Sequence, residues 1–371
     1  MKIVVTKDNL KKVLNLVSHV VGHTSTLPIL SNILMQTDKG RIKISATNLE
    51  IGLTAWVGGR VEEEGGATLP ARTITDYVST TLGDQVTLAK DKEGLTVSTD
   101  VSQATLKTLP PDEFPLIPQL TVGGQIDLPA DELKGAFNET IFAAAPLETQ
   151  PELSGVYVFL DNEKLYFVAT DRYRLTERTV PKANIKVNGN FAPALVPYRT
   201  VNEVVRLLSS VSDGQTTVSV VQGENQILFR LPDIELVSRL IDGQFPDYKQ
   251  IIPANFASTA ILPRYDLMQA VKSAGLFATS SRSVRLSFKV KEGRVEISAA
   301  SGDIGESSVQ VAGEISGDEQ SNTFNYKYIL DYLNNITDEK VVFKTINDNS
   351  PALISPNERQ NNFYVVMPVK S

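Results

Sequence analysis

Apolar residues recur along the chain at two different spacings, and the spacing separates helices from strands. Six segments place apolar side chains three and four positions apart, on one face of a helix, which predicts an amphipathic helix in each segment. The predicted helices cover residues 7–20, 72–82, 129–144, 198–209, 263–278 and 325–336.

Short alternating runs lie between the predicted helices. They are rich in Val, Ile, Thr and Phe, and this alternation of apolar and polar residues is typical of strands that bury one face. Segments with Asp, Asn, Lys and Gly, such as residues 91–94 and 161–164, separate the runs and predict tight turns. The predicted strands cover residues 41–45, 86–89, 95–98, 165–168, 217–221, 226–231, 284–290 and 341–343.

One strand-like segment returns three times along the sequence. Its copies contain Ala46, Ala169 and Ala299, which are 123 and 130 positions apart. A loop, Glu113-Phe114-Pro115, returns as Gln244-Phe245-Pro246 at a spacing of 131. A repeat of about 125 residues has the size of a whole domain, so the sequence predicts one domain fold used three times. The predicted domains cover residues 1–122, 128–251 and 254–371.

Each predicted domain holds two helices and several short strands. This content favours an α+β fold in which an antiparallel sheet carries both helices on one face. Pro and Gly cluster between the copies, at residues 118–124 and 251–255. Linkers this short do not let domains tumble freely, so we expect the three domains to hold a fixed geometry.

Composition narrows the chemistry that the chain can perform. A chain of 371 residues with 42% hydrophobic content can bury three ordinary cores without disulfides or metals. The sequence has no cysteine, which excludes disulfides, zinc ribbons, iron–sulfur ligation and thiol nucleophiles, and suits a reducing compartment. Only His19 and His23 could supply an imidazole, so a Ser-His-Asp triad or a multi-histidine metal site lacks its residues. We expect no cofactor, no metal and no catalytic site.

The sequence also lacks the patterns of membrane insertion. Residues 1–7 have no apolar stretch of the signal-peptide kind. No segment approaches the roughly 18 uncharged apolar residues of a membrane-spanning helix. The expectation is a soluble, cytoplasmic protein.

The net charge of −7 argues against a nucleic-acid partner, because Lys and Arg supply sequence-independent affinity for phosphates. The predicted helices reverse this balance, since they carry ten cations and eight anions whereas the whole chain carries 36 and 43. Solvated faces with i,i+4 pairs would explain any one helix, but six such helices on one side of a repeated sheet favour a shared, weakly basic surface. The ten cations are Lys7, Lys11, Lys12, Arg72, Lys134, Arg199, Arg206, Arg264, Lys272 and Lys327.

Two other functions stay open at this point. A hydrolase with paired carboxylates could use the acidic runs Glu62-Glu63-Glu64 and Asp112-Glu113, but their polar, turn-like surroundings favour solvated loops. The sequence contains no phosphate-binding loop of the G-x-x-x-x-G-K-[ST] kind. The second alternative is a multi-domain scaffold that binds only proteins.

Short motifs spread over all three copies carry a resemblance. They are Thr26-Leu27-Pro28-Ile29-Leu30, Asn32, Pro70-Ala71-Arg72, Thr108-Leu109-Pro110, Phe114-Pro115, Ala169-Thr170-Asp171, Arg174-Leu175, residues 238–243, Phe245-Pro246-Asp247-Tyr248, Phe324-Asn325 and Tyr364-Val365-Val366-Met367-Pro368. Each motif is weak alone, but together they follow one family's order over the full length. The chain resembles the bacterial DNA polymerase III beta subunits, the replicative sliding clamps.

The resemblance implies a DNA clamp fold with three similar domains in each protomer. Two protomers would join head to tail into a closed dimeric ring. Duplex DNA would thread the hole without sequence readout, so the lining needs only a soft positive field. The implied partners are the replicative DNA polymerase, the clamp loader, repair polymerases and mismatch-repair proteins, with no membrane. The protein itself would be a non-catalytic processivity factor.

The resemblance also assigns residues to three surfaces. The cations expected to face DNA are Lys12, Arg72, Lys134, Arg199, Arg206, Arg264 and Lys327, with His23 in a loop where Thr24 replaces a frequent arginine. The expected dimer contact joins Leu106 of one protomer to Leu276 and Phe277 of the other. The expected partner-peptide pocket is lined by Leu153, Thr170, Arg172, Tyr173, Arg174, Leu175, Pro246, Val365, Val366, Met367, Pro368 and Val369.

The last segment of the chain has the chemistry that such a pocket needs. An apolar run at residues 363–369 forms either a last core strand or the lining of a groove for a partner peptide, and alternate side chains can serve both uses. The family commonly has Gly-His where this chain has Arg172-Tyr173, so we expect a bulkier and more cationic mouth. The expected ligand is an extended peptide with a glutamine and two apolar side chains.

Overall fold

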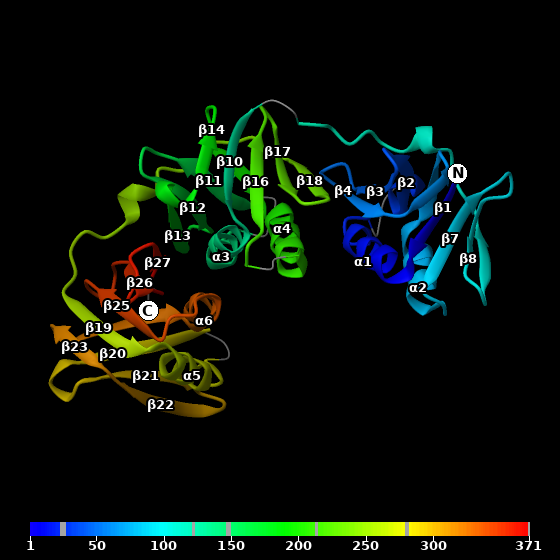
Figure 1. Ribbon diagram of the computed structural model, residues 1–371. Coiled ribbons are helices and arrows are strands. Elements are labelled where there is room, and N and C mark those ends of the chain that lie inside the picture. Colours follow the sequence, from blue (N-terminus) through cyan, green and yellow to red (C-terminus); the bar gives the residue numbers. More distant parts are fainter. Residues whose placement is uncertain (23–26, 121–122, 146–149, 212–213, 279–281, 370–371) are drawn as a thin grey trace. The chain divides into compact units, whose positions relative to one another are not determined.

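The computed structural model describes the chain except residues 23–26, 121–122, 146–149, 212–213, 279–281 and 370–371. Within the described residues, and apart from short 3₁₀ turns, the elements repeat three times in the order β-α-β-β-β-β-β-α-β-β-β. Each copy therefore contributes nine strands and two helices to the part of the chain that is described (Figure 1). The repetition predicted from the spacing of Ala46, Ala169 and Ala299 is present in the fold.

All six predicted helices form. Their C-terminal ends fall up to three residues short of the predicted ends, except in α4, which runs two residues further. The helices are α1 (Lys7–Ser18), α2 (Ala71–Thr80), α3 (Ala130–Ile141), α4 (Tyr198–Val211), α5 (Arg264–Gly275) and α6 (Tyr326–Asn335).

The chain divides into two compact units, and the division does not follow the three copies. The first unit comprises Met1–Ala130, Lys186–Ala192 and Arg206–Leu240. The second comprises Asp131–Ile185, Pro193–Val205 and Ile241–Ser371. The central copy is shared between the two units.

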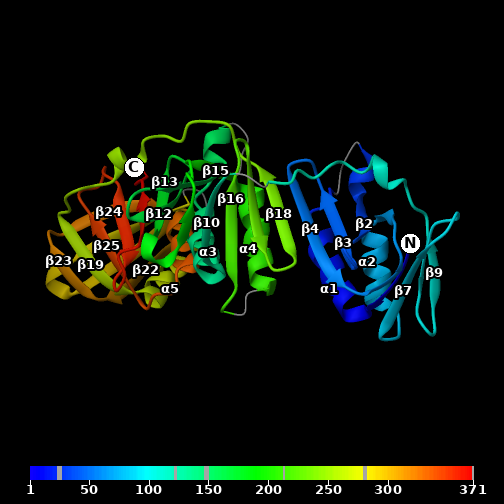
Figure 2. The same cartoon turned by 45° about the horizontal axis from the view of Figure 1, so that its top comes forward.

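The first unit holds two antiparallel sheets. Its five-stranded sheet has the order β5 (Arg60–Glu63), β1 (Lys2–Thr6), β7 (Gln85–Lys90), β8 (Leu95–Ser98), β9 (Gln103–Leu106). Its nine-stranded sheet has the order β14 (Lys186–Asn188), β10 (Gly124–Pro129), β16 (Thr217–Gln222), β17 (Gln226–Leu231), β18 (Ile234–Arg239), β4 (Ile51–Gly58), β3 (Arg41–Thr47), β2 (Asn32–Asp38), β6 (Gly66–Pro70). Figure 2 shows β18, β4, β3 and β2 in this order across the sheet.

The second unit also holds two antiparallel sheets. Its nine-stranded sheet has the order β15 (Ala194–Pro197), β11 (Gly155–Leu160), β12 (Lys164–Thr170), β13 (Arg174–Pro181), β27 (Asn362–Val366), β26 (Ala352–Pro356), β25 (Lys340–Thr345), β19 (Ser258–Pro263), β23 (Glu314–Gly317). Its four-stranded sheet has the order β22 (Gly305–Ala312), β21 (Arg294–Ser301), β20 (Ser283–Lys289), β24 (Gln320–Asn325).

Two strand pairings join neighbouring copies. At the first junction, in the first unit, β18 of the central copy pairs with β4 of the first copy. At the second junction, in the second unit, β27 of the third copy pairs with β13 of the central copy. Among the described strands, β9 and β22 occupy the equivalent places in their own copies but pair on one side only. Each nine-stranded sheet thus runs from one copy into the next.

Helices pack against the sheets within each unit because their apolar positions fall on one face. In the first unit α1 and α2 lie side by side, and α1 buries Leu10 and Leu14 fully. In the second unit α5 and α6 lie side by side, with Val271 and Leu333 in a core that includes Phe343. Burying one such side chain stabilises the fold by about 1.5–3 kcal/mol, so the cores account for the predicted apolar periodicity.

Candidate functional site

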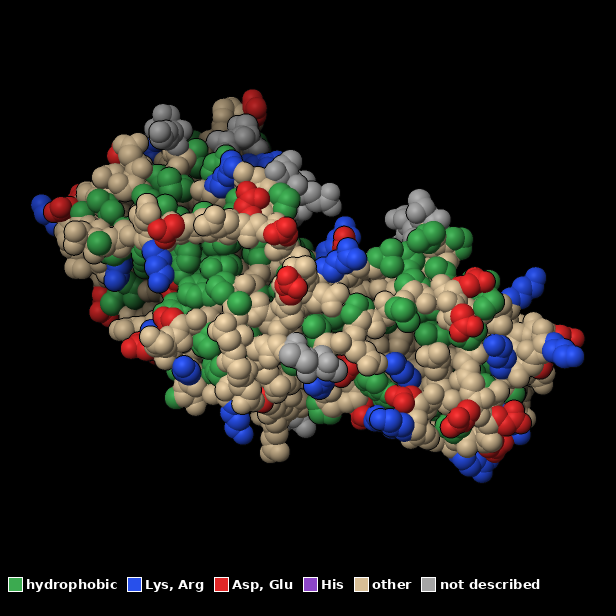
Figure 3. Space-filling view, turned by 90° about the horizontal axis from the view of Figure 1, so that it is seen from above, with side chains coloured by type: hydrophobic (Ala, Val, Ile, Leu, Met, Phe, Trp, Pro, Cys, Tyr) green, Lys and Arg blue, Asp and Glu red, His purple; other side chains and the backbone are tan. Residues whose placement is uncertain are grey.

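The second unit carries a groove at the second junction, with a volume of about 410 Å³. Its walls come from the β12–β13 turn, the start of β13, the end of β27, and two loops. Figure 3 shows hydrophobic side chains gathered in hollows on one face of the molecule. The lining residues are Arg172, Tyr173, Arg174, Leu175, Gln250, Ile251, Ile252, Pro253, Ile346, Ser350, Pro351, Val365 and Met367.

Local hydrogen bonds fix the β12–β13 turn. The Thr170 hydroxyl donates to the carbonyl oxygen of Arg174 at 2.7 Å. Asp171 Oδ1 accepts from the backbone N–H groups of Tyr173 and Arg174, each at 3.0 Å. Arg172 takes a left-handed φ of +78°, which costs a residue with a Cβ about 1–2 kcal/mol. The turn therefore projects Arg172 and Tyr173 into solvent, and 61% of Tyr173 is exposed.

Arg174 is the half-buried cation of the groove. Its Nε lies 2.9 Å from Asp171 Oδ2, its Nη1 lies 2.5 Å from Asp331 Oδ2, and its guanidinium lies 4.5 Å from the centre of the Tyr328 ring. Burial alone would lower the pKa of Arg174, but nearby ionisable groups, including the two carboxylates, hold that pKa above its usual range. The charge of Arg174 is thus neutralised within the protein, and Arg172 is an exposed cation at the mouth of the groove.

The floor of the groove is apolar. Leu175 and Val365 face each other across the second junction and are 0% and 2% exposed. They belong to one buried cluster with Leu153, Phe245 and Tyr248. An apolar floor of this kind favours aliphatic or aromatic side chains of a ligand, because binding removes their surface from water.

Aromatic rings and one half-buried carboxyl, that of Glu177, lie beside this floor. The Tyr248 hydroxyl donates to Glu177 Oε2 at 2.6 Å. Burial raises the pKa of Glu177, and the hydrogen bond from Tyr248 acts in the opposite direction. Burial and the same hydrogen bond raise the pKa of Tyr248. The stacked ring pairs Tyr157–Phe245 and Phe159–Tyr166, with centroids 4.8 Å and 4.5 Å apart, fill the neighbouring face of the sheet.

The groove brings together half of the predicted pocket residues. They are Arg172, Tyr173, Arg174, Leu175, Val365 and Met367. Leu153 and Thr170 are buried next to the groove without lining it, and Val366 is fully buried in the core of the third copy. Pro246 is exposed on the segment before the lining residues. Pro368 and Val369 lie beyond Met367, where the Val369 N–H donates to the carbonyl oxygen of Thr323 at 2.8 Å.

Sequence reasoning missed two lining loops. Residues 250–253 follow the repeated Phe245-Pro246 motif, and Ile251, which is 46% exposed, stands beside Pro253 in a linker. The sequence could have indicated this loop as part of a binding surface, because it places apolar residues in a proline-containing linker. Residues 346–351 carry no such signal, because their place beside the groove depends on the pairing of β26 with β27.

The predicted DNA-facing cations separate into groups in the structure. Exposed positions on the helices hold Lys12, Arg72, Arg199 and Lys327. Lys134 is half-buried on α3. His23 lies outside the described residues. The four exposed cations lie on α1, α2, α4 and α6.

Arg206 and Arg264 are held by backbone carbonyl groups instead. Arg206 Nη2 donates to the carbonyl oxygen of Leu16, in the last turn of α1, at 2.8 Å. Arg264 Nη1 donates to the carbonyl oxygen of Leu333, in the last turn of α6, at 2.8 Å. The last four carbonyls of a helix lack partners within it and carry partial negative charge. Both guanidinium groups therefore stabilise helix ends.

The predicted dimer residues lie near β9 and β22, the two strands that pair on one side only among the strands that the structure describes. Leu106 is the last residue of β9 and is half-buried. Leu276 and Phe277 follow α5, which contacts β22, and 70% of Leu276 is exposed. An exposed leucine at a helix end beside an unpaired strand edge is a surface that an interface would cover.

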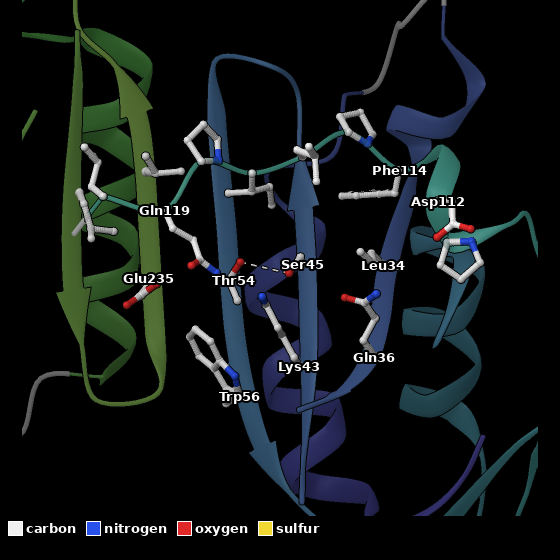
Figure 4. A pocket seen from close by; sticks show the side chains of 18 residues that line it. Leu34, Gln36, Lys43, Ser45, Thr54, Trp56, Asp112, Phe114, Gln119 and Glu235 are labelled. Carbon is white, nitrogen blue, oxygen red and sulfur yellow. Dashed lines mark hydrogen bonds between the residues drawn. The ribbon is translucent and has the colours of Figure 1, made fainter. Parts of the chain in front are cut away.

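The first unit carries a second hollow, beneath the segment that we call the connector, residues 111–120 (Figure 4). Its volume is about 440 Å³. The sheet contributes Lys43 and Trp56, and the connector contributes Phe114 and Gln119. The hydroxyl groups of Ser45 and Thr54 form a 3.0 Å hydrogen bond on its floor. No sequence pattern predicted this hollow, because its two sides are far apart in the chain.

The described residues contain no group of three or more His, Asp or Glu side chains placed to hold a metal ion. The acidic run at residues 62–64 lies at the end of β5 and beyond, where Glu62 pairs with Lys2 at 2.9 Å and Arg60 at 2.6 Å. These are surface ion pairs, not carboxylates facing each other across a cleft. Over the part of the chain that is described, no helix is both long and apolar enough to cross a membrane.

Models of one protein family match the chain along almost its whole length. The N-terminal domain of the DNA polymerase III beta subunit matches residues 1–118. The central domain of the same family matches residues 127–247, and the C-terminal domain matches residues 249–370. The three matches follow the order of the three copies.

Curated relatives and solved structures agree with this match. The chain is 29% identical over 374 residues to the beta sliding clamp of Synechococcus elongatus, covering 100% of this chain and 99% of the relative. It is 26% identical over 381 residues to the beta sliding clamp of Staphylococcus epidermidis, covering 100% of each. The crystal structure of the Pseudomonas aeruginosa DNA polymerase III subunit beta is similar with a TM-score of 0.94 at 28% identity, over 100% of both chains. That of the Thermotoga maritima beta subunit has a TM-score of 0.91 at 27% identity, over 100% of this chain and 99% of that one.

Proposed function

The chain belongs to the DNA polymerase III beta subunit family, and from this premise we propose how its surfaces serve a sliding clamp. The protein is a DNA sliding clamp, a non-catalytic factor that gives the replicative DNA polymerase its processivity. A clamp needs no catalytic group, because it acts by holding its partner on DNA. What remains to be assigned are the closure of the clamp, the surface toward DNA and the surface toward partners.

The clamp closes, in this proposal, as a head-to-tail homodimer. The supporting observation is a joint that occurs twice within the chain, as β18 with β4 and as β27 with β13. In the remaining copies, β9 corresponds to β18 and β27, and β22 corresponds to β4 and β13. Within the described residues, β9 and β22 pair on one side only. Pairing β9 of one protomer with β22 of another repeats the same joint, and a head-to-tail contact that closes gives a ring. Leu106, Leu276 and Phe277 would lie in that contact.

The oligomeric state tests the closure. A Leu276→Ala, Phe277→Ala double variant should run as a monomer at sub-micromolar concentration, where the parent runs as a dimer of 40.5 kDa protomers. Leu116→Ala is the matched control, because Leu116 is 97% exposed and lies on the connector at the first junction, not beside β9 or β22. A double variant that folds normally and stays dimeric would place the interface elsewhere.

Duplex DNA is the first proposed partner, bound without sequence preference by the exposed helix cations Lys12, Arg72, Arg199 and Lys327, with Lys134 beside them. Each should account for at most about one phosphate contact in the salt dependence of binding. Arg206 and Arg264 contribute less to DNA binding, because carbonyl groups already hold them. Retention on circular DNA after loading, followed by release when the circle is cut, tests the topological hold. We place this activity in the cytoplasm, where bacterial replication occurs.

The second-junction groove is the proposed site for peptides of the replicative polymerase, the clamp loader, repair polymerases and mismatch-repair proteins. Each apolar anchor buried on Leu175 and Val365 would contribute roughly 1.5–3 kcal/mol. A few such anchors leave micromolar affinity after the cost of ordering a flexible peptide. Deleting residues 367–371 should abolish binding of a polymerase-derived peptide in calorimetry and leave the dimer intact. Equal affinity of truncated and full-length protein would remove the groove assignment.

A further inference from the structure

The turn at the first junction is built like the turn that walls the groove at the second. The Thr47 hydroxyl donates to the carbonyl oxygen of Ile51 at 2.9 Å, as Thr170 does to Arg174. Asn48 Oδ1 accepts from the backbone N–H groups of Glu50 and Ile51 at 3.0 and 2.8 Å, as Asp171 does two and three residues onward. Leu49 has a φ of +74°, against +78° at Arg172.

The strand that meets each turn also ends in the same way. The Arg239 N–H donates to the carbonyl oxygen of Glu50 at 3.0 Å, and the Met367 N–H donates to that of Tyr173 at 2.8 Å. In the pairing register, Val237 stands opposite Gly52 where Val365 stands opposite Leu175. The backbone that forms the walls of the second-junction groove is therefore also present at the first junction.

The connector fills this place at the first junction. A Cβ on Gly52 would lie 2.7 Å from the side chain of Ile117, and a Cβ on Gly223 would lie 2.5 Å from that of Leu120. The two glycines leave room for two aliphatic side chains, which would have to shift if a larger residue stood at either position. Ile117 and Leu120 pack on a buried apolar cluster formed by Val221, Leu228 and Val237.

The connector is held by side chains alone over its second half. Within the described part of the chain, residues 115–120 form no backbone hydrogen bond with the sheet. Leu116 is 97% exposed, and the hollow of about 440 Å³ lies beneath the segment (Figure 4). Phe114, 5% exposed, anchors its start. The connector is thus a strap with two aliphatic anchors over a partly empty hollow.

We propose that the first junction is a second, latent groove for extended peptides, and that the connector is its built-in occupant. The proposal rests on the proposed peptide groove at the second junction. Its ligand class follows from the occupant: an extended segment with two aliphatic side chains three positions apart, kept extended by prolines such as Pro115 and Pro118. A partner with such a segment binds once the connector is displaced, so each chain offers one permanently open groove and one closed groove.

The test removes the side chains that hold the connector in the groove and supplies the same segment as a separate peptide. An Ile117→Ser, Leu120→Ser double variant removes both anchors, and Leu116→Ser on the same connector is the matched control. The probe is a labelled synthetic peptide of residues 113–120, Glu-Phe-Pro-Leu-Ile-Pro-Gln-Leu. The double variant should bind one more equivalent of probe per chain than the parent and the control. A folded double variant with no added equivalent overturns the proposal.

The location of the added equivalent is tested by also deleting residues 367–371. An equivalent that survives this truncation lies at the first junction, whereas one that the truncation removes lies in the second-junction groove and overturns the proposal. Failure of the proposed function has a different signature, because the parent would then fail to bind a polymerase-derived peptide whatever the double variant does.

A milder change keeps the proposal testable if the double variant does not fold. Gly52→Ala adds the Cβ that meets Ile117, and Gly58→Ala on the same strand is the control, because a Cβ there meets nothing within 4 Å. The first change should accelerate chymotrypsin cleavage at Leu116 by about tenfold, which corresponds to a loss of about 1.4 kcal/mol in connector packing. Equal cleavage of both variants would show that Ile117 is not the anchor and would overturn the proposal.

Discussion

The first and second junctions share a backbone and differ in the side chains that hold them. At the first, the ion pair between Arg41 and Asp233, at 2.5 Å, is 46% and 61% exposed, and the aliphatic connector packs over glycine. At the second, Arg178, Glu139 and Arg359 form a largely buried network that Glu132 and Asp338 complete. One junction is held by an apolar strap and the other by buried charge.

Backbone pairing fixes where two copies meet, but the side chains at the junction decide whether a groove forms there. The strap occupies the outer side of the first junction, so that junction offers no open groove. The network holds the second junction through α3, which carries Glu132 and Glu139, and leaves Leu175 and Val365 to floor a groove. The junctions of the duplicated copies thus differ through a few side chains.

The largest effect should come from breaking the buried network. Glu139→Ala removes the carboxylate that Arg178 and Arg359 share, while Arg178 keeps Glu132 and Arg359 keeps Asp338, so we expect a loss of about 1.5–3 kcal/mol. We expect a lower unfolding midpoint for the second unit in thermal or urea denaturation. Asp76→Ala is the control, because its pair with Arg72, at 3.7 Å, is 71% and 94% exposed. Such surface pairs contribute about 0–1 kcal/mol, so similar losses for both variants would contradict a network that fixes the second junction.

A smaller effect should come from the strap of the first junction. Ile117→Ala removes apolar contacts of a half-buried side chain with the cluster on β16, β17 and β18, at a cost of about 1 kcal/mol. The loss should appear in the unfolding of the first unit. Leu116→Ala, at a side chain that is 97% exposed, should change stability by less than about 0.5 kcal/mol. If the two substitutions are equivalent, the connector does not hold the junction.

A similar stability effect separates two kinds of helix cation. Arg206→Ala removes the hydrogen bond to the carbonyl oxygen of Leu16 and should cost about 1 kcal/mol of stability in the first unit. Lys12→Ala should leave stability unchanged and lower the salt dependence of DNA binding by about one phosphate contact at most. Measuring both quantities for both variants tests the assignment, which fails if Lys12 governs stability or Arg206 governs the salt dependence.

The smallest effect concerns Glu177, the carboxyl beside the second-junction groove. Burial raises the pKa of Glu177, so its stabilising contribution is complete only below its unfolded-state pKa and is lost as the pH rises through the folded-state pKa. Glu177→Gln keeps an acceptor for the Tyr248 hydroxyl without the charge. The variant should therefore gain stability relative to the parent as the pH rises from the unfolded-state pKa of a glutamate, about 4.3, through the higher folded-state pKa of Glu177. A difference that stays constant over this pH range would contradict the assigned pKa shift.

Local pattern was enough to predict the helices and the repeated strands. α1 to α6 follow from apolar spacing within a few turns, and β8 and β17 form over the same residues as predicted. The junctions were not predictable in this way, because β4 and β18 are separated by most of two copies and pair only once both are folded. The pattern of apolar residues therefore recovered the number of copies but not which strands pair across each junction.

The site was predictable to the extent that its residues sit on local motifs. Arg172, Tyr173 and Leu175 come from one turn, and Val365 and Met367 come from the last strand and its end. The sequence does not distinguish a helix cation that faces solvent from one that donates to a carbonyl group. The contacts of Arg206 and Arg264 were therefore not predictable before the tertiary structure was known. The same holds for Ile117, whose place over Gly52 no pattern marked.

The sharing of the central copy between two compact units limits how the chain can be divided. A fragment cut at a boundary between sequence copies would bare the full length of β18 or of β4. A bared strand edge offers a row of unsatisfied N–H and C=O groups that pair with any available strand. Isolated copies should therefore aggregate or associate with one another in solution, although each carries its own apolar core. The unit that was duplicated is thus smaller than the unit that can stand alone.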